Sequence, residues 1–147
     1  MILDERTEFA DAVALNTGAA GTYNVGDIID SSVARDLGQK PVYLVIQVAV
    51  AATSGGSATC EFRLVSDATS TISTTTATIH YKSFAIPVAS MVAGYQLVIP
   101  LPAGSPDYER YLAIQQVTGA AAFTAGAINA FLTLDPNGNK SYPDGTN

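Results

Sequence analysis

Short apolar runs bounded by glycine, proline, serine and asparagine recur along the chain, and no stretch has the spacing of an amphipathic helix of normal length. The alternation is clearest in residues 59–66, where Cys60, Phe62 and Leu64 share one face and Glu61 and Arg63 share the other. This pattern predicts a strand with one buried face. Similar patterns predict further strands at 8–15, 25–30, 42–50, 78–86, 96–101, 110–117 and 127–134.

The segments between these runs have the composition of turns and loops. Residues 31–37 are expected to form one helical turn, which Ser31 or Ser32 can cap. Residues 51–58 are small and glycine-rich, and residues 67–76 are rich in hydroxyl groups, so both are predicted to be loops. Pro87 either ends the pairing of its strand or marks a sheet edge.

About eight strands joined by turn-rich connections are typical of an all-β antiparallel sandwich, and we expect a jelly roll. The 147 residues suit one domain with its own core. We place that domain at 1–135, with an N-terminal arm of about residues 1–8. Residues 136–147 contain two prolines and two glycines, so we expect them to form an extended C-terminal tail.

The strand predicted at 42–50 lacks charge on both faces. Leu44, Ile46 and Val48 lie on one face, and Tyr43 and Val45 lie on the other. A sandwich strand normally has one solvated face. Either a loop of the same chain shields the second face, or this face is a subunit interface that contains Tyr43 and Val45.

Composition supports a partly covered surface, because 48% of the residues are hydrophobic and only 14% are charged. Uncharged polar side chains offer a second explanation for the low charge. The net charge is −6 and the seven Lys and Arg residues form no basic run, which argues against nucleic acid and an anionic membrane surface as partners. The beginning of the chain lacks the apolar core of a signal peptide. The uncharged stretches 83–106 and 111–134 are interrupted by proline or glycine, so strands and turns explain them better than membrane spans.

The residue pattern contains no recognisable catalytic, cofactor-binding or metal-binding motif. His80 is the only histidine, and no nucleophile elbow accompanies it, so we expect a surface or interface residue. Cys60 alternates with large apolar residues and is expected to be buried. The segment that begins at Asp135 imitates a calcium loop but lacks the required glycine and glutamate. We therefore predict a protein that is not an enzyme and has no cofactor.

An ordered set of segments resembles the small jelly-roll cement, or head-decoration, proteins of short-tailed bacteriophages. The segments are MILD at 1–4, VARDLG at 33–38, PVYLVIQV at 41–48, IPVASMVAGY at 86–95, PLP at 100–102, RYL at 110–112, FTAG at 123–126 and TLD at 133–135. No single segment is specific, but their order is. The loop at 67–76 and the long tail depart from the family pattern.

The resemblance implies a virion protein, made in the host cytoplasm, that sits on the outside of the head and joins neighbouring major capsid subunits. It also implies a homo-oligomer, with a dimer favoured over a trimer. Ile2, Leu3 and Phe9 are the expected apolar anchors of the N-terminal arm, and Tyr142 is the expected anchor of the tail. Arg35 is expected to pair with an acid across an interface or, as the alternative, with Asp36 or Asp30 of the same chain.

Two other functional classes fit an all-β frame. The first alternative is a carbohydrate-binding jelly-roll module, such as a receptor-binding or lectin-like head, although the chain has no tryptophan for sugar stacking. The second is a cupin-like enzyme, which needs several metal-binding histidines, whereas this chain has one.

Overall fold

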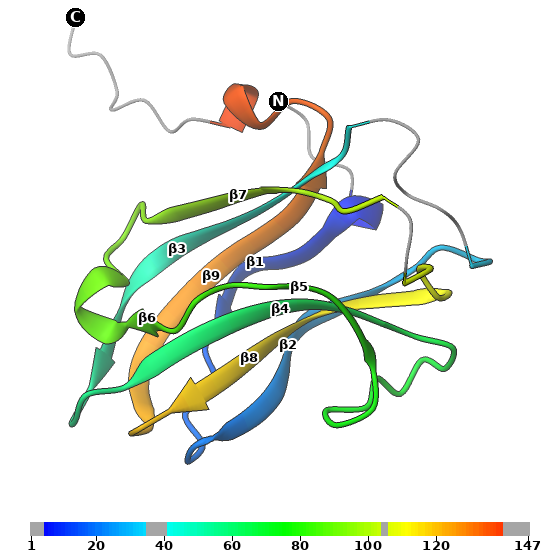
Figure 1. Ribbon diagram of the computed structural model, residues 1–147. Helices are drawn as coiled ribbons and strands as arrows, with labels where there is room; N and C mark the ends of the chain where they lie inside the picture. The colour runs from blue at the N-terminus through cyan, green and yellow to red at the C-terminus, as the bar shows by residue number, and fades with distance from the viewer. Residues whose placement is uncertain (1–4, 35–40, 104–105, 140–147) are drawn as a thin grey trace, which may run out of the picture.

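The protein is a sandwich of two antiparallel sheets, as predicted (Figure 1). The computed structural model describes residues 5–34, 41–103 and 106–139. One sheet has the order β1-β9-β3-β7, and the other has the order β2-β8-β4-β5 with β6 beside β4. When the two-residue β6 is left out and the remaining strands are renumbered from one to eight, these orders become 1-8-3-6 and 2-7-4-5. That arrangement is the jelly roll that the sequence predicted.

Nine strands and three short 3-10 helices make up the described part of the chain, which contains no α-helix. The strands are β1 (Glu8–Ala14), β2 (Gly21–Asp30), β3 (Tyr43–Ser54), β4 (Thr59–Asp67), β5 (Thr78–Lys82), β6 (Ile86–Pro87), β7 (Gln96–Pro100), β8 (Tyr111–Gly119) and β9 (Phe123–Thr133). The 3-10 helices are η1 (Glu5–Thr7), η3 (Val88–Ser90) and η4 (Pro136–Asn139).

The core lies between the two sheets and is filled by alternate residues of the long strands. Cys60, Phe62 and Leu64 point inward from β4, as their alternation predicted, and Leu112 and Ile114 do the same from β8. Burial raises the pKa of the Cys60 thiol to about 12, so this cysteine is an inert apolar residue of the core.

Gly26 allows β1 and β2 to approach each other closely. Its φ of +79° lies in the left-handed region, and a Cβ atom at this position would lie 2.0 Å from the carbonyl oxygen of Phe9. The register of β2 against β8 shifts between Val25 and Ile29, which places the glycine in a bulge.

Several predicted boundaries were wrong. β3 extends to Ser54, four residues into the predicted loop 51–58, because Thr53 and Ser54 pair with β9. The Thr53 hydroxyl also lies 2.8 Å from that of Thr124. The predicted strand 78–86 breaks after Lys82, because Ser83 turns into the interior. Leu134, the last residue of the predicted strand 127–134, is 67% exposed because β9 ends at Thr133.

The structure describes residues 31–34 of the predicted helical turn and parts of the predicted arm and tail, whereas residues 35–37 of the turn lie outside the described residues. Ser31 and Ser32 cap no helix within residues 31–34. The Ser31 hydroxyl donates instead to the carbonyl oxygens of Val33 and Arg110. Residues 5–7 of the predicted arm form η1, and residues 136–139 of the predicted extended tail form η4.

Candidate interaction surface

The outward side of β3, β7 and β9 carries no formal charge. The inward residues of these strands are Leu44, Ile46, Val48, Leu97, Ile99, Ile128, Ala130 and Leu132. Successive strand residues alternate between faces, so the neighbours of these residues point outward. We call this outward set the first-sheet face: Tyr43, Val45, Gln47, Gln96, Val98, Pro100, Asn129, Phe131 and Thr133.

The centre of the first-sheet face is already closed within one chain. Val45 is paired on one side with Val98 and on the other with Phe131, and its exposed fraction is 0%. Tyr43 pairs with Pro100 and is half-buried. The exposed part of the face is therefore its margin, at Tyr43, Val98 and Pro100.

One polar group on this face has no hydrogen-bond partner within the described residues. The Nε2 atom of Gln96 is buried and makes no hydrogen bond. Leaving a buried donor unpaired costs about 1–3 kcal/mol, so such an atom needs an explanation. It lies next to Gln47, in the same cross-strand pair.

The predicted interface residues fall into three groups. Ile2, Leu3, Arg35 and Tyr142 lie outside the described residues. Phe9 is not an anchor on an arm, because it lies in β1 and is fully buried in the core. Tyr43 and Val45 lie together on the first-sheet face, where only Tyr43 retains exposed surface.

The opposite outer face, on the second sheet, is shielded by the loop at residues 68–77. Ile72 packs on Val65 and Ala113 and forms a small second core with them. Two side chains hold this loop in place. Asn24 donates to the carbonyl oxygen of Ile72 at 2.9 Å, and Gln115 donates to that of Ser73 at 3.0 Å. For the strand that became β3, the sequence analysis offered shielding by a loop of the same chain as one of two alternatives. The structure shows such a loop on the second sheet, where it covers β4 and β8.

A serine, a histidine and a glutamate meet where the loop before β8 contacts β4 and β5. The Oγ atom of Ser66 lies 2.7 Å from Nε2 of His80 and accepts a hydrogen bond from the backbone N–H of Glu109. The ring of Tyr108 stacks on His80 with 3.9 Å between the ring centroids. Ser66 is fully buried, so a substrate carbonyl cannot reach its hydroxyl. The cluster therefore holds the loop in place.

His80 makes the stability of this cluster dependent on pH. Burial lowers the pKa of His80, while the Glu109 carboxylate and a hydrogen bond to the backbone of Pro106 oppose that shift. Below about pH 6.5 the unfolded chain therefore binds the proton more readily than the folded chain. The free energy of unfolding should fall between pH 7.5 and pH 5.5, and urea unfolding should show a smaller fall for His80→Gln. Equal slopes for both proteins would exclude His80 as the cause.

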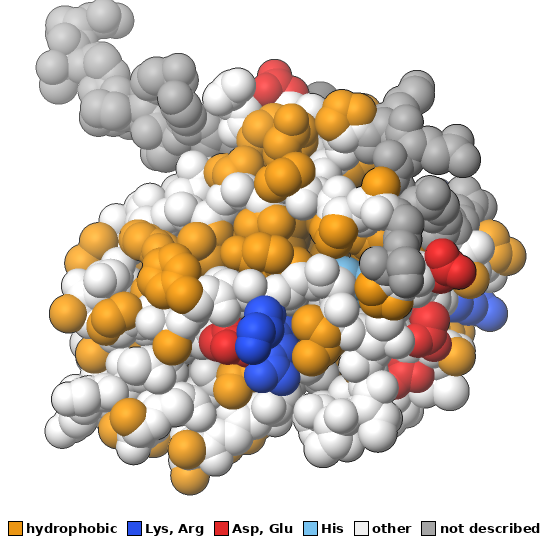
Figure 2. All heavy atoms as spheres, in the orientation of Figure 1, with side chains coloured by type: hydrophobic (Ala, Val, Ile, Leu, Met, Phe, Trp, Pro, Cys, Tyr) orange, Lys and Arg blue, Asp and Glu red, His pale blue; other side chains and the backbone are white. Residues whose placement is uncertain are grey.

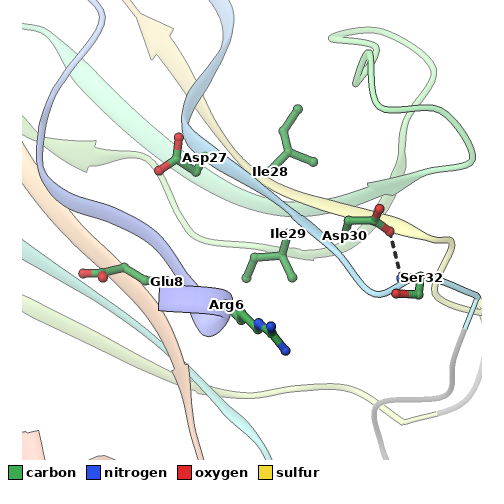
Figure 3. Close-up of a pocket in the computed structure, with 7 residues that line it drawn as sticks. All are labelled: Arg6, Glu8, Asp27, Ile28, Ile29, Asp30 and Ser32. Carbon is green, nitrogen blue, oxygen red and sulfur yellow. Dashed lines mark hydrogen bonds between the residues drawn. The ribbon is translucent and has the colours of Figure 1, made fainter. Parts of the chain in front are cut away.

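A polar hollow of about 660 Å³ lies between η1, β1 and β2 (Figure 3). Arg6, Glu8 and Asp27 line it, and in the close-up their charged groups extend in different directions. Asp30, also at the rim, is paired with Arg110 at 2.8 Å and accepts from the backbone N–H of Ser32. The pairing with Arg110 lowers the pKa of Asp30 to about 2. These charged groups do not converge on one point, so the hollow has no donor set for a ligand.

No group of three or more His, Cys, Asp or Glu side chains that could hold a metal lies within residues 5–34, 41–103 and 106–139. In the same part of the chain, no helix is long and apolar enough to cross a membrane.

Comparison with models of protein families identifies the family of this chain. Residues 9–132 match the model of a family described as Bbp16, which covers most of the sandwich. No curated protein matches the chain.

Proposed function

This chain belongs to the Bbp16 family, and from that premise we propose that it is a bacteriophage cement protein. It binds the outside of the head and joins neighbouring major capsid subunits. The observation that carries the proposal is the uncharged first-sheet face of a jelly roll, which supports a protein that works by contact with other proteins. The ordered segments that resemble short-tailed phage cement proteins support the same function.

The first-sheet face is the proposed contact between copies of the chain. A symmetric dimer uses the same patch on both subunits. The exposed residues at the β3–β7 margin of this face are neutral, and the acidic residues of the sheet, Glu8 and Asp11, lie on β1 beyond β9, so a contact at the β3–β7 margin would not oppose like charges. The unpaired Gln96 amide also lies on this face, and rearrangement at an interface could supply its acceptor. A dimer is favoured and a trimer remains the second possibility.

A symmetric oligomer suits the task of joining shell subunits. When one copy of the chain has bound a capsid subunit, the linked copy faces the next subunit at a high effective concentration. Several contacts of ordinary size, about 800 Å² per partner, can then hold a joint that a single contact cannot hold.

The N-terminal segment gives the first test. Deleting residues 1–7 removes η1 but leaves β1 and the buried Phe9 intact, so the fold should remain. We expect the deletion to weaken binding to undecorated heads at least tenfold, because a terminal segment can bind a neighbouring subunit, for example by adding a strand to an exposed sheet edge. Cosedimentation with heads measures binding, and circular dichroism checks the fold. If the folded deletion variant binds heads as wild type does, the arm has no part in the proposal. If wild type binds a glycan array and not heads, the carbohydrate-binding alternative is favoured.

A further inference from the structure

Phe84 is a large aromatic residue that the fold holds in solvent. It lies between β5 and β6, and 63% of its surface is exposed. Single exposed apolar residues are common on protein surfaces, so the exposure of Phe84 is informative only together with its fixed backbone and its charged neighbours. An exposed aromatic side chain that is rigidly held can serve as a binding anchor.

Buried Ser83 fixes the backbone that carries Phe84. The Ser83 hydroxyl accepts from the backbone N–H of Phe62 at 3.0 Å and donates to the carbonyl oxygen of Phe84 at 2.8 Å. The backbone N–H of Ser83 also donates to the carbonyl oxygen of Phe62 at 2.8 Å. Phe62 belongs to the core, so these bonds tie the exposed aromatic to the rigid centre of the sandwich. Because the backbone at Phe84 is already fixed, little backbone conformational entropy is lost when this residue binds.

Positive charge lies beside this aromatic. Lys82 pairs in register with Arg63 across β4 and β5. Arg63 is neutralised by Glu61, at 2.6 Å, whereas Lys82 makes no ion pair within the described residues. Of these two cations, Lys82 therefore keeps its charge unpaired within the described residues, on a protein of net charge −6.

Further apolar side chains surround this charge. Figure 2 shows one group of Lys and Arg side chains over β4 and β5, with hydrophobic side chains on both sides of it. Tyr81 of β5 and Tyr95, just before β7, pack against the core instead, so Tyr81 lies on the opposite face of β5 from Lys82 and is not part of this surface.

We propose that the surface formed by Arg63, Lys82 and Phe84, here called the Phe84 surface, binds an acidic, apolar segment of a partner protein. Phe84 packs on the apolar residues of that segment, and Lys82 pairs with its carboxylate. The charges of the rest of the chain act weakly at this contact, because physiological salt screens charges beyond about 8 Å. A nucleic acid fits poorly, because backbone binding requires several free cations. The assignment of the segment to the major capsid protein rests on the proposed function.

The test compares three variants that change exposed residues. Phe84→Ser removes the aromatic, Lys82→Glu reverses the charge, and Ile28→Ser is the matched control. Ile28 is 40% exposed and lies on β2, at the edge of the second sheet opposite β5. In cosedimentation with undecorated heads, Phe84→Ser and Lys82→Glu should each bind about tenfold more weakly than wild type, as expected for a binding hot spot. Ile28→Ser should bind like wild type, and all three variants should unfold at wild-type urea concentrations.

A second arm separates this proposal from the proposed function. An array of twelve-residue peptides that mix Asp or Glu with Leu, Ile or Val is probed with the same proteins. We expect wild type and Ile28→Ser to bind a subset of these peptides that Phe84→Ser and Lys82→Glu do not bind. If wild type ignores heads but shows this peptide pattern, the capsid assignment fails and the surface stands. Binding to heads and peptides that is equal in all variants, or loss of self-association in Phe84→Ser, would overturn the proposal.

Discussion

Gly26→Ala is expected to lower the free energy of unfolding by about 3 kcal/mol, which is among the larger effects of single substitutions. The left-handed φ of +79° alone costs an alanine about 1–2 kcal/mol. The added Cβ would also lie 2.0 Å from the Phe9 carbonyl oxygen, so β1 and β2 would have to separate. Urea unfolding monitored by circular dichroism measures the change.

Gly55 provides the matched control for this prediction. A Cβ atom at Gly55 meets nothing within 4 Å, so Gly55→Ala should change the free energy of unfolding by no more than about 0.5 kcal/mol. Equal stability of the two variants would show that β1 and β2 do not depend on their close approach at Gly26.

Tyr43→Asp is expected to weaken self-association about a hundredfold, which corresponds to about 3 kcal/mol. The proposed interface brings two copies of the uncharged first-sheet face together, so the substitution would bury a carboxylate without a partner. Sedimentation equilibrium measures the association constant.

Two controls separate this effect from damage to the fold. Tyr43→Thr keeps the position neutral and suited to a strand, so it should weaken association less than aspartate does. Circular dichroism should give the same β content for both variants. If Tyr43→Asp associates like wild type, the contact between copies lies elsewhere on the molecule.

The alternation of apolar residues was enough to predict the sandwich. Cys60, Phe62 and Leu64 on one face, and Leu112 and Ile114 in a second strand, point inward as the pattern indicated. A period of two in a run of residues is a local property, so it can be recognised without knowledge of the partner strands.

Features that depend on strand register could not be predicted. Ser66, His80 and Tyr108 are far apart in the sequence and meet only because β4 pairs with β5 and the loop before β8 folds against them. Gly26 lay inside the predicted strand 25–30, and nothing local in the sequence shows that Phe9 passes within contact distance of it. Phe9 itself was misplaced, because alternation does not show where an arm ends and a core strand begins.

The sequence indicated only part of the two proposed interaction surfaces. The uncharged strand 42–50 indicated the first-sheet face, but its central residue Val45 proved to be buried between Val98 and Phe131. Phe84 gave one signal in the sequence, as a phenylalanine two residues after the charged Lys82. Its exposure depends on Ser83, which turns inward and interrupts the strand, and no pattern in the sequence shows that turn.

Imaging purified protein mixed with undecorated heads tests the central claim most directly. The account predicts added density on the outer surface of the shell, placed over the junctions between neighbouring capsid subunits and large enough for an oligomer of the sandwich. Shells that stay bare at saturating protein concentrations would contradict it.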